Sequence, residues 1–149
     1  MLSWAVESSP DREAERAVDA SAAALGLDCR VVACAYSLNG SRPLAVELLA
    51  SDERPSAVLC LSDSIAYGVY AACAELGLSI PGDVAVAGFG DHPISRLLSP
   101  PLTSTVWNVD QVAERATGFL IRAIGADGPQ ATLREVIAPV LAARASTDG

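Results

Sequence analysis

The sequence predicts an α/β fold, with a parallel, Rossmann-like sheet that carries helices on both faces. Short apolar runs alternate with segments of helical period, a pattern typical of parallel sheets with right-handed crossovers. The runs are nearly continuously apolar, as expected for strands covered on both faces. Two of them end in a small residue beside an acid, at Ser62-Asp63 and Gly90-Asp91. Ligands bind at the carboxyl ends of the strands in such sheets, so residues 57–91 indicate one site.

Up to residue 91, the chain is expected to form strand and helix three times, and then a fourth strand. Apolar runs predict the strands over 2–6, 29–35, 57–61 and 84–89. The first helix ends at Gly26, the second is short and follows a loop over 37–41, and the third ends at Gly77. Glycine after the last residue of helical period is a common helix stop.

The alternation of apolar runs and helical segments stops after residue 91. Residues 92–101 are poor in regular structure, and Pro100-Pro101 is stiff and supplies no backbone donor. A strand over 102–107, a helix over 109–124 capped by Asn108 or Asp110, and two short strands over 133–137 and 140–143 follow. One strand and one helix cannot bury their own apolar faces. We therefore expect a main lobe over 1–99, a strand and helix of an incomplete second lobe over 100–130, and a return to the main lobe over 131–149.

Composition excludes several classes of protein. The chain has 149 residues, 51% of them hydrophobic, and a formal net charge of −8 with no basic run, which argues against direct nucleic-acid binding and against anionic membranes. The start has no basic or long apolar stretch, so we expect neither a signal peptide nor a membrane span. The four cysteines lack zinc-like spacing and are expected to be buried thiols of a cytoplasmic protein.

Motifs for chemistry are missing as well. His92 is the single histidine, and no Ser or Cys nucleophile motif accompanies it. No metal-ligand spacing is present, and Gly88-Phe89-Gly90 lacks the third glycine and the helix of a phosphate-binding loop. We expect no catalytic residues, no metal and no cofactor.

One long run carries a family resemblance. The chain from Leu59 to Ala116 contains LCLSDSIAYGVYAACAELGLSIPGDVAVAGFGDHPISRLLSPPLTSTVWNVDQVAERA. It resembles the C-terminal half of LacI/GalR-family transcription regulators, whose pattern runs from Asn-Asp at a strand end through Gly-Phe/Tyr-Asp-Asp to Pro-Pro-Leu-Thr-Thr. The weaker DREAERAVDA helix and the ending Arg144-Ala-Ser-Thr extend the likeness over the whole chain.

The resemblance implies a periplasmic-binding-protein-like fold of two lobes that hold a small effector between them, often a sugar, a nucleobase or a related polar metabolite. DNA would be bound only through a helix-turn-helix domain that is absent from this chain. We expect a homodimer or higher oligomer, with the helix over 64–76 contributing to the interface and the uncovered helix over 109–124 adding a second apolar face.

Five residues are candidate ligand contacts, each with a structural alternative. Asp63 matches the Asp of Asn-Asp and is either a helix N-cap or a hydroxyl-binding carboxylate. Ser62 replaces the Asn and offers a single hydroxyl. Asp91 matches the second Asp of Asp-Asp, or fixes a turn. The resemblance implies that Arg16 points into the ligand cleft; the alternative is an ion pair on the helix surface. Trp107 stacks on a ligand ring, or packs in the core.

Gly90 departs from the family pattern, because it replaces the Asp that typically reaches a sugar. The leading hypothesis is therefore an effector-sensing domain whose ligand is not established. A solute-binding protein of a sugar transport system is the alternative. An α/β enzyme is a third class, which two acids at neighbouring strand ends would allow.

Overall fold

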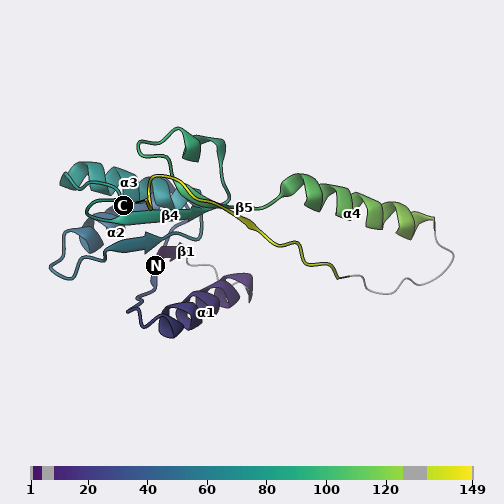
Figure 1. Cartoon of the computed structure of the whole chain (residues 1–149), viewed down its shortest axis with the longest axis horizontal. Coiled ribbons are helices and arrows are strands. Elements are labelled where there is room, and N and C mark those ends of the chain that lie inside the picture. The colour runs from purple at the N-terminus through teal and green to yellow at the C-terminus, as the bar shows by residue number, and fades with distance from the viewer. Residues whose placement is uncertain (1, 5–8, 126–133, 149) are drawn as a thin grey trace.

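The computed structural model describes residues 2–4, 9–125 and 134–148 (Figure 1). Its elements alternate as the sequence predicts. In chain order they are β1 (Leu2–Trp4), α1 (Ser9–Ala24), β2 (Val32–Cys34), α2 (Leu38–Leu49), β3 (Ala57–Leu59), α3 (Asp63–Leu76), β4 (Ala85–Phe89), the 3₁₀ turn η1 (Pro93–Arg96), β5 (Thr103–Val106), α4 (Val109–Ile124) and β6 (Val140–Ala142).

The main sheet is mostly parallel, which confirms the predicted fold class. Its strand order is β3-β4-β5-β6, and the pairs β3–β4 and β4–β5 are parallel. β6 is antiparallel to β5 because the chain leaves along β5, passes through α4 and returns in the opposite direction. β1 and β2 form a separate parallel pair rather than continuing this sheet through hydrogen bonds.

The core lies between α2, α3 and the main sheet. Its fully buried side chains include Leu49, Ile65, Val69, Val86 and Leu102. α2 and α3 approach closely at Gly68, where a Cβ would lie 2.0 Å from Ser41 Oγ and 2.8 Å from the backbone N of Arg42. The Ser41 hydroxyl donates to the carbonyl of Ile65 at 3.1 Å, so a polar contact joins the two helices inside the core.

Two sequence predictions of local structure are wrong. The expected loop over 37–41 is the first turn of α2, because Ser37 caps it by accepting a hydrogen bond from Gly40 N at 3.1 Å. Residues 134–137 form no strand, and Leu133 lies outside the described residues. The stop at Gly77 is confirmed: this residue ends α3 in the left-handed region at φ 68°.

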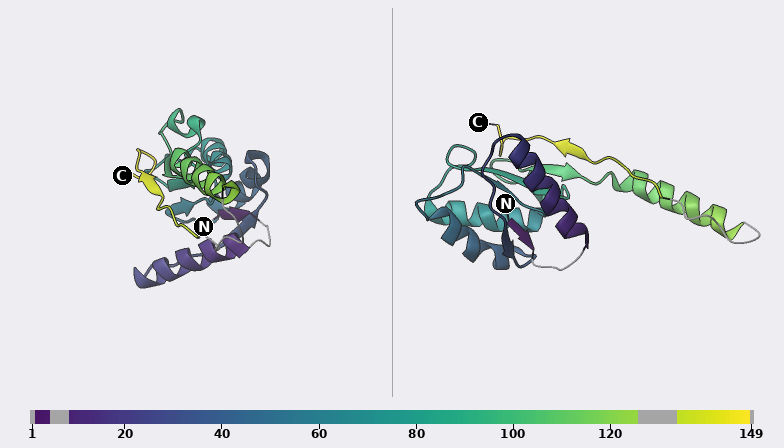
Figure 2. Two further views of the ribbon diagram at one scale, coloured as in Figure 1. Left: turned by 90° about the vertical axis from the view of Figure 1, so that its right-hand side faces the viewer. Right: turned by 90° about the horizontal axis from the view of Figure 1, so that it is seen from below.

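α1 and α4 are less enclosed than α2 and α3. α1 lies apart from α2 and α3 (Figures 1 and 2); Ala22 on it is buried, whereas Leu25, directly after its last residue, is 74% exposed. α4 stands away from the rest of the fold in Figure 1 and in the right view of Figure 2, and it contains no buried residue. The uncovered apolar stripe that the sequence predicts on this helix is thus present.

The cysteines are free thiols. Cys34, Cys60 and Cys73 are buried, as predicted, and Cys29 is partly exposed. Burial raises the pKa of the Cys60 thiol, and it raises that of Cys73 to about 11. These two thiols are therefore protonated at neutral pH and act as small apolar core groups.

Candidate functional site

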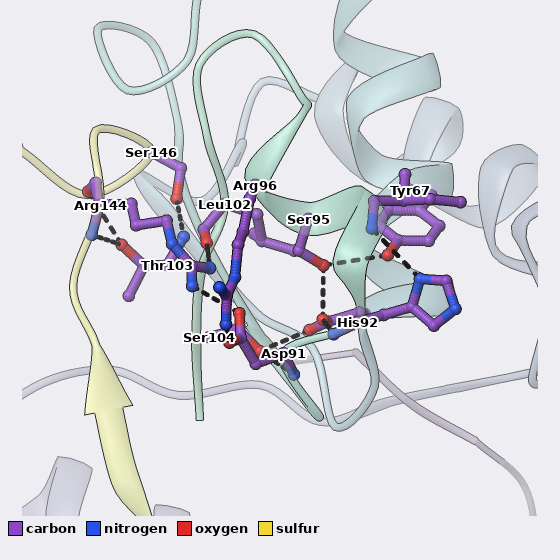
Figure 3. A network of polar contacts seen from close by, with 12 residues as sticks. Tyr67, Asp91, His92, Ser95, Arg96, Leu102, Thr103, Ser104, Arg144 and Ser146 are labelled. Atoms are coloured by element: carbon purple, nitrogen blue, oxygen red, sulfur yellow. Dashed lines mark hydrogen bonds and ion pairs between the residues drawn. The ribbon is translucent and has the colours of Figure 1, made fainter. Parts of the chain in front are cut away.

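The candidate site is the carboxyl edge of the main sheet, where β3 and β4 end and the chain crosses to α4. The loops that follow these strands bring Asp63 and Asp91 to one hydrogen-bonded network; Figure 3 shows Asp91 and Ser104 within it. Ser104 of β5 joins the two acids, because its hydroxyl donates to Asp63 Oδ1 at 2.6 Å and accepts from Asp91 N at 3.0 Å. The sequence prediction that both acids belong to one edge is consistent with this geometry.

Asp63 is neither the helix cap nor an open ligand group. Ser62 is the N-cap of α3, and its hydroxyl accepts a hydrogen bond from Ser64 N at 3.1 Å. Asp63 is the first helical residue and is 3% exposed. Its Oδ2 accepts hydrogen bonds from His92 N at 2.7 Å and from Ser95 Oγ at 2.5 Å. The carboxylate therefore ties the loop after β4 to the start of α3.

The backbone makes room for this buried carboxylate at Gly88. A Cβ at that position of β4 would lie 2.3 Å from Asp63 Oδ1 and 3.0 Å from Leu102 Cδ2. Asp63 is held by three hydrogen bonds and cannot move aside without breaking them. Glycine is thus required here by close approach rather than by backbone conformation.

Ser95 extends the network toward α3. Its hydroxyl lies 2.9 Å from the Tyr67 hydroxyl, and it is fully buried (Figure 3). Burial raises the pKa of the Tyr67 phenol, and the hydrogen bond to Ser95 opposes that effect. The ring of His92 is exposed, meets the Tyr67 ring edge to face at 6.5 Å, and accepts from Ile94 N through Nδ1 at 3.3 Å.

Asp91 is the anchor of two arginines. Its Oδ2 accepts from Arg96 Nη2 at 2.6 Å, and its Oδ1 accepts from Arg144 Nη2 at 2.5 Å. The side chain is 2% exposed, and the residue adopts a left-handed backbone conformation at φ 49°. Burial alone would raise the pKa of Asp91, but the hydrogen bonds and charges of Arg96 and Arg144 outweigh it and lower the pKa. These contacts fix the turn after β4, which is the structural alternative given above for Asp91.

The C-terminal tail is built into the same edge. Arg144 Nη1 donates to the carbonyl of Leu102 at 2.6 Å, and Arg144 N donates to Thr103 Oγ1 at 2.8 Å. Ser146 is fully buried; its hydroxyl donates to Val86 O at 2.6 Å and accepts from Thr103 N at 2.8 Å. The tail thus fastens β4 to β5 just after the chain returns from α4.

The other predicted site residues lie apart from this network. Arg16 is exposed on α1 and is not among the residues that the network joins. Trp107 is 56% exposed, so core packing is the wrong alternative for it. Its ring packs edge to face on Phe89, with the ring centroids 5.1 Å apart, where the chain leaves β5 for α4. Trp107 therefore presents an aromatic surface at the crossing.

Sequence reasoning missed four residues that build the network. Ser104 and Arg144 lie in the family segments quoted above but were given no role, and Ser95 and Arg96 carry no motif; each contacts an acid in the folded chain. The hydroxyls of Ser95 and Ser104 both donate to a carboxylate, an arrangement that supports a loop rather than activating a nucleophile. No cluster of metal-binding side chains exists within residues 2–4, 9–125 and 134–148.

Comparisons with known proteins match this architecture. A family model described as a periplasmic binding protein-like domain matches residues 4–147. The chain belongs to this family. It is 42% identical over 77 residues to the lactose operon repressor of Rhizobium radiobacter, covering 52% of this chain and 68% of that protein. It is 37% identical over 112 residues to the HTH-type transcriptional regulator MalR of Streptomyces coelicolor, covering 75% of this chain and 32% of that protein.

A solved structure agrees over nearly the full length. The regulatory protein of the LacI family from Chloroflexus aggregans is 25% identical and superposes with a TM-score of 0.88, covering 98% of this chain and 53% of that chain. The chain thus spans about half of this solved relative. It corresponds to the C-terminal effector-binding region of LacI/GalR-type regulators, as the resemblance implied. No helix in the described part of the chain is long and apolar enough to cross a membrane.

Proposed function

We propose that this chain is the small-molecule-sensing part of a LacI-type transcriptional regulator. The observation that carries the proposal is the coincidence of two features at one sheet edge. Asp63 and Asp91 organise the loops there, and the chain also leaves for α4 and returns from it at the same edge (Figure 1). A ligand at this edge contacts the place where two lobes are joined.

The mechanism follows from that position. A ligand that contacts both lobes stabilises the arrangement in which they are closed, and this shifts the population toward that arrangement. Regulation then requires that the shift reach a DNA-binding domain, which we assign to another part of the regulator. We assign residues 1–99 and 131–149 to the sensing lobe and residues 100–130 to the second lobe.

The candidate contacts have different roles in this proposal. Trp107, whose ring packs on the half-buried Phe89, offers exposed ring surface to a sugar or nucleobase, whereas Ser62 and Asp63 hold the edge in shape. We assign Arg16, which is exposed on α1, to the ligand in the closed arrangement. The effector is a polar metabolite, the protein works in the cytoplasm, and no chemical step is assigned to it, since its relatives are named as regulators.

Thermal unfolding in the presence of ribose, lactose and free nucleobases tests the proposal. Ligand at about 100 times its Kd adds about 2.7 kcal/mol to the free energy of unfolding, which raises the midpoint by several degrees. Trp107→Ala should reduce that rise. Leu25→Ala, which removes another exposed apolar side chain at the end of α1, should leave it unchanged. Equal shifts in the two variants would remove Trp107 from the site.

A further inference from the structure

The two acids at the sheet edge have their oxygens engaged within the protein. Asp63 accepts from Ser104 through Oδ1 and from His92 N and Ser95 through Oδ2. Asp91 accepts from Arg144 through Oδ1 and from Arg96 through Oδ2. Both carboxylates are almost fully buried. Carboxylate oxygens are strong acceptors for ligand hydroxyls, and here neither acid is open to that use.

An exposed charged group at this edge is instead the guanidinium of Arg96. The Arg96 side chain is 64% exposed, and its guanidinium is held beside the end of β4 by the 2.6 Å contact with Asp91 (Figure 3). A guanidinium has five N–H donors, so one hydrogen bond to Asp91 leaves others for a ligand. The contact also fixes where the guanidinium stands before a ligand arrives, which reduces the entropy lost on binding.

The local charge favours an acidic ligand at this point. Two guanidinium groups meet the single carboxylate of Asp91, although the chain as a whole has a formal net charge of −8. Arg144 is 16% exposed and is tied to Leu102 O as well as to Asp91, so it compensates the acid from inside. Asp63 is 3% exposed, and its carboxylate accepts from three donors within the protein.

We propose that the effector carries an acidic group, a carboxylate or a phosphate, and that Arg96 binds it at the edge of the sheet. The planar fork of arginine matches both groups with paired hydrogen bonds. This inference rests on the sensing function proposed above and names the chemical class of the ligand. Trp107, which packs on Phe89 at the end of β4, is the candidate contact for the uncharged part of the same molecule.

The test is a set of titrations of the 149-residue chain, followed by thermal unfolding and by calorimetry. The probes are ribose and ribose 5-phosphate, glucose and gluconate, and inorganic phosphate, each against sodium chloride at equal ionic strength. The variants are Arg96→Gln, Arg96→Lys and the control Arg42→Gln. Arg42 is 51% exposed and forms a 2.6 Å ion pair with Glu75, so the control removes a comparable pair elsewhere on the surface.

We expect an acidic probe to bind saturably and more tightly than its neutral counterpart. Arg96→Gln should weaken that binding by about ten- to a hundredfold, Arg96→Lys by less, and Arg42→Gln not at all. Ribose 5-phosphate and gluconate distinguish a phosphate from a carboxylate as the group that is bound. Equal affinities in Arg96→Gln and Arg42→Gln, or acidic probes no better than chloride, would overturn the inference.

The two proposals fail in different ways. If a neutral sugar binds and Arg96→Gln leaves its affinity unchanged, the sensing function stands and the acidic ligand is wrong. If neither neutral nor acidic probes bind while the unliganded midpoint of the wild-type chain shows a folded protein, both proposals are contradicted.

Discussion

Gly88 and Asp63 illustrate at the scale of single residues how the sheet edge is kept in shape. Gly88→Ala should lower the free energy of unfolding by about 1–3 kcal/mol, the usual range for overpacking. The added methyl group would lie 2.3 Å from an Asp63 oxygen that three hydrogen bonds hold in place. Urea denaturation measures the change. Gly125→Ala, whose Cβ would come no closer than 3.6 Å to another atom, should change stability much less.

Asp91 gives a pH-dependent prediction. Its native-state pKa is lowered by Arg96 and Arg144, so its contribution to stability is complete above the unfolded-state pKa of about 3.9 and is lost as the pH falls through the native value. Asp91→Asn should be less stable than wild type at neutral pH, and the difference should shrink on acidification toward pH ~3. Midpoints of urea unfolding at several pH values measure both effects.

The remaining acid dependence of Asp91→Asn has an identified source. The pKa of Asp83 is also lowered, by hydrogen bonds from the Ser79 hydroxyl and backbone N–H, so its contribution to stability is likewise lost on acidification. An Asp91→Asn variant that kept the full wild-type pH dependence would show that the arginine contacts are not what stabilises this edge in solution.

The sequence placed Asp63 and Asp91 at strand ends, but it did not assign their roles. The three donors to Asp63 lie 29, 32 and 41 positions away, and Arg144 lies 53 positions from Asp91. Spacing rules for caps and turns reach only a few residues. Such rules identify an acid that suits the start of a helix, but they do not identify hydrogen-bond partners that lie far away in the sequence.

At the scale of the elements, the contact between α2 and α3 sets a limit on side-chain size. Gly68→Ala should destabilise the chain by about 1–3 kcal/mol, because its Cβ would meet the backbone of Arg42 and of Leu38 at 2.8 and 2.9 Å. Gly118→Ala in α4 is the matched control. Its Cβ would meet only Arg122 Nη1 at 3.6 Å, and alanine favours helix by about 1 kcal/mol. Opposite signs in denaturant midpoints would bear out the difference.

Prediction of the elements succeeded where hydrophobic period and end signals agreed. α3 is the clearest case, since its apolar face and Gly77 both indicate the same helix. It failed at α2, where Asn39 and Gly40 favour a loop but the Ser37 cap extends the helix over them. It also failed over 134–137, because an apolar run does not specify a neighbouring strand to pair with.

At the scale of the whole molecule, α4 is the feature that sets behaviour in solution. Val109, Leu120 and Ile124 are each more than 60% exposed, so the helix offers an apolar face to another chain. We expect a dimer or higher species, which sedimentation velocity over a wide range of concentrations would detect. Leu120→Glu should shift the population toward monomer, whereas Glu114→Gln on the same helix should not.

A monomer at every concentration would contradict this expectation. The sequence also suggested that the helix over 64–76 contributes to the interface. In the structure the apolar face of α3 packs in the core, with Ile65, Ala66 and Val69 fully buried, so those side chains are not available to a partner. Periodicity finds an apolar face, but it does not say whether the same chain covers it.

The paired strands β5 and β6 connect the sheet edge to α4. Their pairing runs from Ser104 with Ala142 to Val106 with Val140, and Arg144 fastens the returning strand to Asp91. A single extended strand can swivel about its bonds, but a hydrogen-bonded ribbon resists independent sliding of its two strands. A rotation of α4 is therefore transmitted along the paired strands to their base. Arg144 and Arg96 both contact the carboxylate of Asp91 there.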